Sequence, residues 1–329
     1  MSDPQQKPSV YLAAPLPAHV RAAIDDACTV VAEDAGLPSA TRLAAILPQV
    51  VGLLVSNQLR LDNALIAANP GLRVLSNYGV GYDNVDVAFA TAHKLLVCNT
   101  PEVLNEAVAD LTLGFLLDLL RRIPEAHQFM RGGQWSAGAP FPLGHDPRGK
   151  LLGLLGFGRI AHAVARRAAP FGLRVAYYDP RRDQQAERDG LATYMDRDDL
   201  FRAADVLSIH VLLDESTRRL VGARELALMQ PHAYLINTSR GPVLDQAALV
   251  AALQAGAIAG AALDVFESEP LPADDPLLAL PNVLLAPHMA SGTEETRMAM
   301  AELAGRNLID AVHGRRPDAV VNPEVLNEG

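Results

Sequence analysis

The sequence predicts an α/β fold of two domains, each built on a doubly wound parallel sheet. The chain has 329 residues, more than one compact domain of ordinary size needs, and half of them are hydrophobic. Short apolar runs alternate with segments of helical periodicity along most of the chain. Such runs are typical of parallel strands that are buried on both faces. One of them leads into a glycine-rich turn, residues 156–161, which is typical of a strand that leads into a helix.

The first predicted domain contains five strands and a glycine-rich loop. The loop, residues 75–86, follows the fourth strand, at the sheet edge where open parallel sheets bind ligands. Backbone N–H groups near Val80 and Gly81 can hold a carboxylate there, although the two neighbouring glycines are equally consistent with a plain turn. The predicted strands are Val10 to Ala13, Val30 to Ala32, Gly52 to Val55, Val74 to Ser76 and Leu95 to Cys98.

A long helix is predicted from Asn105 to Arg122, where apolar residues recur at helical spacing and Pro124 is expected to stop the helix. After a short helical piece, the chain is rich in Gly and Pro through Pro147. A long irregular segment in a compact enzyme is usually functional or lies at an interface. Trp135, the single tryptophan, lies in this segment.

The second predicted domain begins with the strand Leu151 to Leu155 and its glycine turn. Gly156 permits the tight turn, Gly158 lets a pyrophosphate approach the backbone, and Ala161 lets the following helix pack on the strand. Asp179 follows about twenty residues later, at the end of the next strand, where a carboxylate accepts hydrogen bonds from ribose hydroxyls. This order predicts a dinucleotide site; an ordinary strand-to-helix turn is the alternative. The further strands are Val175 to Asp179, Val206 to His210, Ala233 to Asn237, Ile258 to Asp264 and Val283 to Leu285.

Polar side chains follow three of these strands. Arg240, Glu269 and His288 each come shortly after a strand, and the carboxyl ends of parallel strands share one sheet edge. A histidine alone is more often structural, but here a cation and a carboxylate arrive with it. Reduction of a carbonyl group requires a proton donor and a fixed cation, because charge grows on the oxygen. The three residues are therefore a candidate catalytic group.

Composition excludes several other classes of function. The formal net charge of −10 and the lack of a basic run argue against a nucleic-acid surface. No apolar run approaches the roughly 18 residues of a membrane span, and the polar residues 1–6 lack a targeting signal. The two cysteines, Cys28 and Cys98, have no metal or pairing spacing and are expected to be buried thiols. We expect a cytoplasmic enzyme that acts on a small molecule without a metal.

Together these motifs resemble the D-isomer-specific 2-hydroxyacid dehydrogenases over nearly the whole chain. The matching segments are Tyr78 to Asp83, Gly156 to Ala161, Ile236 to Pro242, Asp264 to Phe266, Glu269 to Pro270 and Pro287 to His288. The resemblance implies a flavodoxin-like substrate domain, residues 1–104 plus 294–329, to which a helix from Thr293 to His313 returns the chain. It implies a Rossmann-type NAD-binding domain, residues 105–293. A dimerisation arm at about residues 105–147 would make the protein a homodimer.

The resemblance also implies roles for individual residues. His288 would donate and accept the proton, Glu269 would pair with it and favour the protonated ring, and Arg240 would bind the substrate. Trp135 would reach the substrate site of a neighbouring subunit; the alternative is an aromatic anchor within its own subunit. Leu212 stands where the family usually has proline. The expected cofactor contacts, besides Gly156, Gly158 and Asp179, are Arg159, Ile160, His210, Val211, Leu212, Thr217, Thr238 and Asp264.

Within the family, the segment from Pro287 to Arg297 looks most like the glyoxylate and hydroxypyruvate or hydroxyphenylpyruvate reductases. A reductase for a bulkier 2-oxo acid, or an NAD-sensing protein like the C-terminal-binding corepressors, remains the alternative. Formate dehydrogenases are disfavoured by Glu269, and phosphoglycerate dehydrogenases by the absence of room for a regulatory domain. Asp179 favours NAD over NADP, because a carboxylate repels a 2′-phosphate, while Arg181 and Arg182 can soften that preference.

Overall fold

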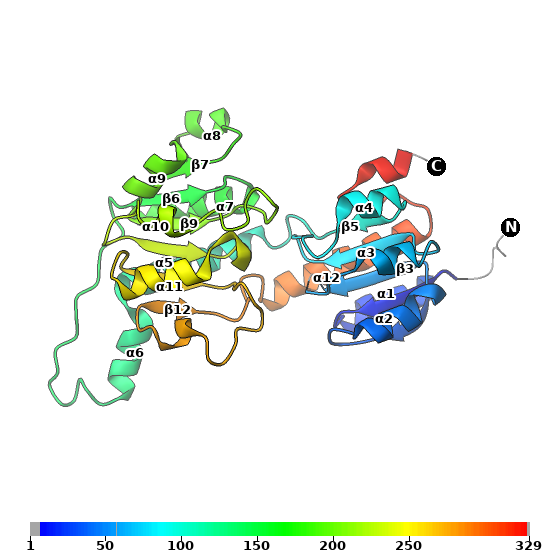
Figure 1. The fold of residues 1–329 in the computed structure, drawn as a ribbon, viewed down its shortest axis with the longest axis horizontal. Coiled ribbons are helices and arrows are strands. Elements are labelled where there is room, and N and C mark those ends of the chain that lie inside the picture. The colour runs from blue at the N-terminus through cyan, green and yellow to red at the C-terminus, as the bar shows by residue number, and fades with distance from the viewer. Residues whose placement is uncertain (1–6, 57, 328–329) are drawn as a thin grey trace. The chain divides into compact units, whose positions relative to one another are not determined.

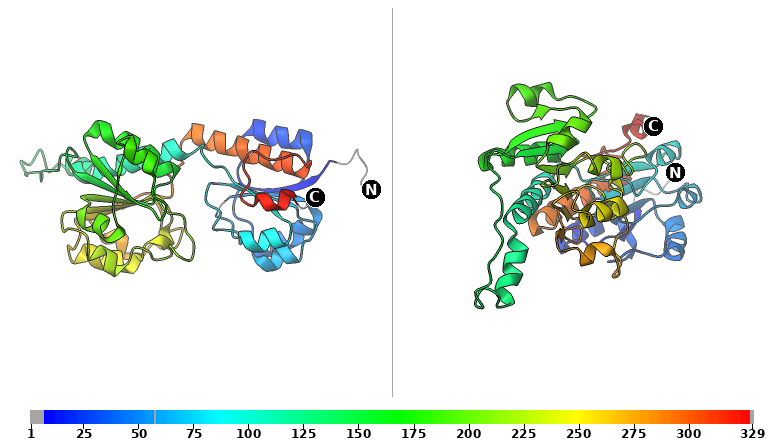
Figure 2. Two further views of the ribbon diagram at one scale, coloured as in Figure 1. Left: turned by 90° about the horizontal axis from the view of Figure 1, so that it is seen from above. Right: turned by 60° about the vertical axis from the view of Figure 1, so that its left-hand side comes forward.

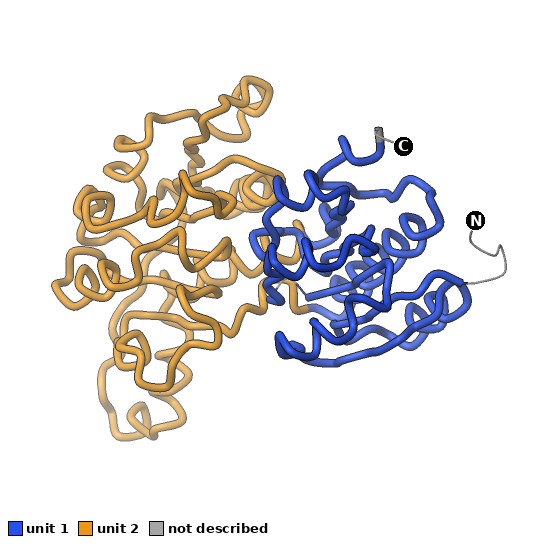
Figure 3. Tube along the Cα trace, turned by 45° about the vertical axis from the view of Figure 1, so that its right-hand side comes forward, with its two compact units in different colours: residues 1–104, 293–329 blue, residues 105–292 orange. Residues whose placement is uncertain are grey.

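The computed structural model describes residues 7–56 and 58–327, which fall into two compact units (Figure 3). Unit 1 comprises residues 1–104 and 293–329, and unit 2 comprises residues 105–292. Each unit has its own parallel sheet with helices on both faces. The polar residues 1–6, on which the prediction of a missing targeting signal depends, lie outside the described residues.

The sheet of unit 1 has the strand order β2-β1-β3-β4-β5, and its strands pair in parallel. This is the flavodoxin-like order, and it agrees with the predicted fold class. Each strand lies within two residues of its predicted bounds. The strands are β1 (Ser9–Ala13), β2 (Thr29–Glu33), β3 (Gly52–Ser56), β4 (Val74–Tyr78) and β5 (Leu96–Cys98).

Helices cover both faces of this sheet (Figures 1 and 2). One face is covered by α1 (Ala18–Ala27) and the long α12 (Glu294–Val312), which pack side by side; α12 packs against β3, β4 and β5. The side chain of Thr293 caps α12 by accepting a hydrogen bond from Thr296 N. The opposite face carries α2 (Ala40–Ile46), α3 (Asn63–Ala67) and α4 (Val87–Ala92), with short 3₁₀ turns η1 (Leu47–Gln49) and η5 (Pro323–Asn327) elsewhere in the unit.

The sheet of unit 2 has the order β12-β11-β10-β9-β6-β7-β8, again with parallel pairing. Counted from β6, the chain first builds outward to β8 and then restarts at β9 on the other side. This is the Rossmann-type order, and its switch point lies between β6 and β9. The two-residue strand β8 was not predicted, because so short an edge strand has no periodicity. The strands are β6 (Leu151–Leu155), β7 (Arg174–Tyr178), β8 (Thr193–Tyr194), β9 (Val206–Ile209), β10 (Tyr234–Asn237), β11 (Gly260–Leu263) and β12 (Val283–Leu285).

Helices cover both faces of this sheet (Figure 2). A cluster of buried apolar side chains lies on each face. On one face α5 (Asn105–Arg121) and α7 (Arg159–Ala168) pack on each other and on the central strands. On the other face lie α9 (Arg197–Ala203), α10 (Ala223–Leu226) and α11 (Gln246–Gln254). The remaining elements are α8 (Gln184–Arg188), η2 (Ala169–Phe171), η3 (Gly241–Val243) and η4 (Pro276–Ala279).

The long helix α5 ends earlier than Pro124, which corrects the prediction. Arg122 adopts a left-handed backbone conformation with φ of 55°, and this residue breaks the helix. Pro124 then lies in the first turn of α6 (Ile123–Arg131), where its missing N–H costs nothing. No residue of α6 is buried, so the helix does not pack into the core of unit 2.

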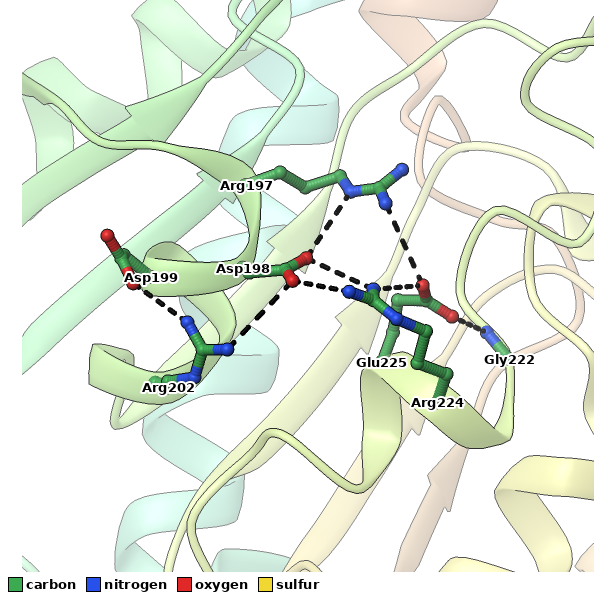
Figure 4. A network of polar contacts seen from close by, with 7 residues as sticks. All are labelled: Arg197, Asp198, Asp199, Arg202, Gly222, Arg224 and Glu225. Atoms are coloured by element: carbon green, nitrogen blue, oxygen red, sulfur yellow. Dashed lines mark hydrogen bonds and ion pairs between the residues drawn. The ribbon is translucent and has the colours of Figure 1, made fainter.

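A polar network joins α9 to α10 on the outside of unit 2 (Figure 4). Glu225, nearly buried, accepts hydrogen bonds from Gly222 N at 3.1 Å and from the Arg224 guanidinium at 3.0 Å. Arg224 also pairs with Asp198 of α9. Because several charges share these contacts, the network fixes the two short helices relative to each other more firmly than an isolated surface pair would. Its other members are Arg197, Asp199 and Arg202.

Across the described part of the chain, no helix is both long enough and apolar enough to cross a membrane. Cys28 and Cys98 are buried free thiols, as predicted. Burial raises their pKa values to about 11 and about 12, so both thiols stay protonated at neutral pH.

Candidate active site

The glycine turn after β6 lies at the switch point of the unit 2 sheet. Gly156 has φ of +91°, and a Cβ atom there would approach the His210 carbonyl group to 2.9 Å. Both the conformation and the space therefore require glycine. Gly156 N donates to Tyr178 O and His210 N donates to Leu155 O, so the turn is tied to both neighbouring strands.

The turn fits a dinucleotide. Gly158 is the residue before α7, and a Cβ atom on it would meet no protein atom within 4 Å. Internal packing therefore does not require glycine here, whereas close approach of a pyrophosphate does. Gly158 contributes no side-chain cap, so the N-terminal turn of α7, which begins with Arg159 and Ile160, presents backbone N–H groups to an anion. Ala161 is completely buried and lets α7 pack on the sheet.

Asp179 follows β7 directly and lies on the glycine turn. Its carboxylate accepts hydrogen bonds from Phe157 N at 3.0 Å and Arg181 N at 2.9 Å. The two arginines beyond it differ. Arg182 is held by Glu187 through two hydrogen bonds of 2.7 and 2.6 Å, whereas the exposed Arg181 guanidinium has no hydrogen bond to a carboxylate among the described residues. Of the two, Arg181 is therefore the one placed to meet a phosphate.

The segment after β9 carries four further candidates for cofactor contact. His210 Nε2 lies 2.9 Å from Ser208 Oγ, and burial lowers the His210 pKa to about 4, so this ring is neutral. Thr217 Oγ1 donates to Leu212 O at 2.6 Å and closes a small loop. Leu212 is largely exposed and Val211 is partly buried. The replacement of the family's usual proline by Leu212 therefore leaves the loop intact.

His288 and Glu269 form a direct pair. Their atoms Nδ1 and Oε2 lie 2.6 Å apart, and about a quarter of each side chain is exposed. The other carboxylate oxygen of Glu269 accepts a hydrogen bond from Phe266 N at 3.0 Å. Burial by itself raises the Glu269 pKa, but the hydrogen bond and charge of His288, the Phe266 N–H and the charge of Arg240 outweigh it, and the net pKa is below the ordinary value. Glu269 is thus both a loop cap and the partner of His288.

Arg240 lies at the end of the same sheet edge, after β10. Asn237 Nδ2 donates to Arg240 O at 3.0 Å and fixes its backbone, while an Arg240 guanidinium nitrogen donates to Ser239 O at 2.8 Å. The next residue, Gly241, explains the motif: a Cβ atom there would lie 1.8 Å from Phe266 O. The loop that carries Arg240 therefore packs directly on the loop that leads to Glu269. The charge of Arg240 contributes to the lowered Glu269 pKa, which places the two side chains in one electrostatic site.

Asp264 holds the backbone of the loop that carries His288. Its two carboxylate oxygens accept hydrogen bonds from Met289 N at 2.7 Å and Ala290 N at 2.8 Å, and its carbonyl accepts one from His288 N at 2.9 Å. His288 has φ of +51°, a conformation uncommon for a residue other than glycine. Asp264 is almost completely buried, and burial raises its pKa against the effect of these hydrogen bonds. The sequence suggested a cofactor contact for Asp264; the structure adds this anchoring of His288.

Thr238 has a buried hydroxyl partner that the sequence did not reveal. Thr112 Oγ1, on α5, donates to Val108 O at 2.8 Å and lies 3.1 Å from Thr238 Oγ1. Because a hydroxyl has one hydrogen, Thr112 accepts in the second bond and Thr238 donates. Thr238 is therefore left as an acceptor toward any cofactor group. In the sequence, Thr112 could have been identified as a site residue only because it is a polar residue on the apolar face of a predicted helix.

The glycine loop of unit 1 begins at the end of β4, where the sequence predicted it. Val80 is partly exposed and Gly81 is buried, and their carbonyl oxygens accept hydrogen bonds from Asn99 Nδ2 and Asn77 Nδ2. These two asparagines were not among the predicted site residues. Within the described residues, no group of three or more His, Cys, Asp or Glu side chains is arranged to hold a metal ion.

Comparison with known proteins defines the class to which this fold and site belong. The family model described as D-isomer specific 2-hydroxyacid dehydrogenase, NAD binding domain, matches residues 113–290. The chain is 42% identical over 325 residues to a glyoxylate reductase of Thermofilum pendens, covering 97% of this chain and 96% of that protein. The chain therefore belongs to the D-isomer-specific 2-hydroxyacid dehydrogenases, NAD(P)-dependent oxidoreductases. The resemblance inferred from the sequence motifs is confirmed.

Other relatives agree. The glyoxylate/hydroxypyruvate reductase B of Shigella boydii is 42% identical over 325 residues, with 98% of this chain and all of that protein covered. Among solved structures, an NADPH-dependent glyoxylate/hydroxypyruvate reductase of Sinorhizobium meliloti, crystallised with NADP and malonate, superimposes with a TM-score of 0.85 at 38% identity. That alignment covers 96% of this chain and 97% of the other.

Proposed function

We propose that this dehydrogenase reduces glyoxylate and hydroxypyruvate with NADH, with His288, Glu269 and Arg240 as its catalytic residues. The observation that carries the proposal is the 2.6 Å contact between His288 Nδ1 and Glu269 Oε2, at the sheet edge that also carries Arg240. The names of the relatives that match most of the chain support the choice of substrate.

The roles follow from the chemistry of the reaction. A bound nicotinamide supplies a hydride to the carbonyl carbon. His288 donates a proton to the carbonyl oxygen from Nε2, since Nδ1 is engaged by Glu269. Arg240 binds the oxygen on which charge develops and the neighbouring carboxylate, a task suited to its planar fork. In unit 1, the N–H groups of the loop at Val80 and Gly81 bind the substrate carboxylate.

A rate panel tests the choice of substrate. Glyoxylate, hydroxypyruvate, pyruvate and phenylpyruvate are each supplied with NADH, and kcat/KM is measured. The proposal expects the first two to give the highest values. Phenylpyruvate as the best substrate would favour a reductase for bulkier 2-oxo acids. Absence of turnover with all four, despite NADH binding, would favour an NAD-sensing protein of the corepressor type.

We further propose that NADH is preferred over NADPH. Asp179 is fixed on the glycine turn, and two like charges about 4 Å apart repel each other by about 4 kcal/mol at an effective dielectric constant near 20. The exposed Arg181 opposes this preference, and the relative from Sinorhizobium meliloti is NADPH-dependent. Replacing Arg181 by Ala should lower kcat/KM with NADPH and leave that with NADH unchanged. Arg182→Ala is the matched control. Equal efficiency of the unaltered enzyme with both cofactors would contradict the preference.

We also propose a homodimer formed through α5, α6 and the segment up to residue 147. Helix α6 buries none of its residues, and Leu143 and Trp135 are 92% and 66% exposed in the single chain. Such exposure of large apolar side chains on one segment is typical of an interface. Trp135 is not packed within its own unit, which favours a role toward the neighbouring subunit.

A further inference from the structure

Three successive carbonyl groups of the glycine loop in unit 1 are held from the buried side. The donors are one backbone N–H and two asparagine amides, and all three donor residues are at least nine-tenths buried. The loop follows β4, and two of the donor residues follow β5, the neighbouring strand. The pairs are Thr100 N with Gly79 O at 2.9 Å, Asn99 Nδ2 with Val80 O at 2.9 Å and Asn77 Nδ2 with Gly81 O at 2.6 Å.

The orientation of the carbonyl groups determines that of the next N–H groups. In a trans peptide the C=O of one residue and the N–H of the following residue point in opposite directions. The N–H groups of Val80, Gly81 and Tyr82 therefore point away from the donors that hold Gly79 O, Val80 O and Gly81 O, respectively. Successive N–H groups that face one side of a loop form a concave site that attracts an anion.

Further hydrogen bonds hold the Asn77 amide and the Asn99 backbone. Asn77 Oδ1 accepts a hydrogen bond from Asn84 Nδ2 at 3.2 Å, so the Asn77 NH₂ group faces Gly81. The backbone of Asn99 is held through its carbonyl, which accepts from Asn307 Nδ2 of α12 at 3.0 Å. Both residues are therefore part of the buried, hydrogen-bonded interior of unit 1.

We propose that Asn99 and Asn77 are positioning residues that keep the loop at Val80 and Gly81 in its carboxylate-binding conformation and thereby set the KM for the 2-oxo acid. The inference rests on the proposed function, which assigns the substrate carboxylate to this loop. Neither asparagine needs to touch the substrate. Asn99 acts through the Val80 carbonyl group, whose peptide partner is the Gly81 N–H that does. Asn77 holds the next carbonyl group, that of Gly81, and so fixes the backbone on the other side of Gly81.

The decisive variant is Asn99→Asp, which keeps the shape of the side chain and replaces the donor by a carboxylate that repels the Val80 carbonyl. We expect the KM for glyoxylate to rise about tenfold or more, because the binding N–H groups are misdirected, with a smaller change in kcat. The Kd for NADH should stay within about twofold, since the glycine turn that fits the dinucleotide belongs to unit 2.

Asn322→Asp is the matched control. Asn322 is also a completely buried amide of unit 1, and its Nδ2 donates to Leu95 O and Thr91 Oγ1 at 2.9 Å, away from the loop. It should lower Tm, as Asn99→Asp does, and leave the KM for glyoxylate within about twofold. A merely structural role for Asn99 predicts the same KM for both variants at equal loss of Tm.

The pH dependence provides a second readout. Below the pKa of the introduced carboxyl, the protonated side chain again has a hydrogen to donate to Val80 O. The ratio of the KM of Asn99→Asp to that of the unaltered enzyme should therefore fall toward one as the pH is lowered. If Asn99→Asp does not fold, Asn99→Ala and Asn77→Asp replace it in the same measurements.

The outcomes separate the inference from the proposed function. No reduction of glyoxylate or hydroxypyruvate by the unaltered enzyme overturns the proposed function. Reduction by the unaltered enzyme, with the same KM in folded Asn99 variants and in the Asn322 control, overturns the positioning role alone. A raised KM that is confined to the Asn99 and Asn77 variants supports it.

Discussion

Glu269 contributes two separate interactions, and they can be separated by a change of one atom. One carboxylate oxygen accepts from Phe266 N and the other contacts His288. Its pKa is lowered on balance, so the side chain is a carboxylate throughout the neutral range. Gln has the same shape and retains an amide oxygen for Phe266 N, but carries no negative charge to stabilise a protonated His288.

We predict that Glu269→Gln moves the upper pH limit of 2-oxo acid reduction to lower pH. Reduction requires protonated His288, and the hydrogen bond and charge of His288 help to lower the Glu269 pKa, which indicates that the charged pair is favourable. Gln removes that pairing, so rates should decline at a lower pH. Oxidation of the 2-hydroxy acid requires neutral His288, so its limit also moves down and it suffers less at mildly acidic pH. The measurement is kcat/KM against pH in both directions. Profiles that coincide with those of the unaltered enzyme would show that the pair is not coupled.

At Arg240 the geometry of the cation is decisive. Lysine keeps the charge but lacks the planar fork that binds a carboxylate oxygen and a carbonyl oxygen together. We predict that Arg240→Lys raises KM and also lowers kcat, because the contact to the carbonyl oxygen strengthens as charge develops. Steady-state kinetics with glyoxylate test this. Values of both parameters within about twofold of the parent would mean that the substrate is held elsewhere.

At the scale of elements, the turn between β6 and α7 contains two glycines, and glycine is needed at the two positions for different reasons. Gly156 is required by the protein itself, since it has positive φ and the His210 backbone leaves no room for a Cβ. Gly158 has extended backbone angles and open space around it. The sequence motif assigned a tight turn to the first glycine and close approach of a pyrophosphate to the second.

We predict that Gly158→Ala folds with an unchanged Tm but binds NADH more weakly, because its methyl group occupies the place of the pyrophosphate. Gly156→Ala should lower Tm, since a side chain there is strained in conformation and in space. Thermal melting and NADH titration of both variants check this. If NADH binding by Gly158→Ala equals that of the parent, the dinucleotide does not approach this turn.

The sequence predicted the order of the elements well and the polar supports poorly. Buried parallel strands appear as continuous apolar runs, so the bounds of β6 and β12 are those predicted. The edge strand β8 has only two residues, too few to form a continuous apolar run in the sequence. Arg240, Glu269 and His288 could be predicted because strand ends share one edge. Asn99 and Thr112 could not, because each acts through a partner that only the folded chain brings near.

At the scale of the whole molecule, the segment that follows α5 has exposed apolar side chains that the structure of a single chain does not explain. It exposes apolar side chains that a stable monomer normally buries. The rings of Phe129 and Phe141, whose centroids lie 5.1 Å apart, pack on each other and not on the core of unit 2. A two-fold partner can bury such a segment, because each copy presents the same surface to the other.

We therefore predict that the protein sediments at micromolar concentration as two chains of 35.1 kDa. The double substitution of Met130 by Lys and Leu143 by Glu should shift it toward one chain, because two charges would have to be buried without partners in the interface. Leu37→Glu, at a similarly exposed leucine in unit 1, is the control and should leave the mass unchanged. A parent protein that sediments as a monomer would contradict the dimer. A double variant that remains dimeric would place the interface away from α6 and the segment that follows it.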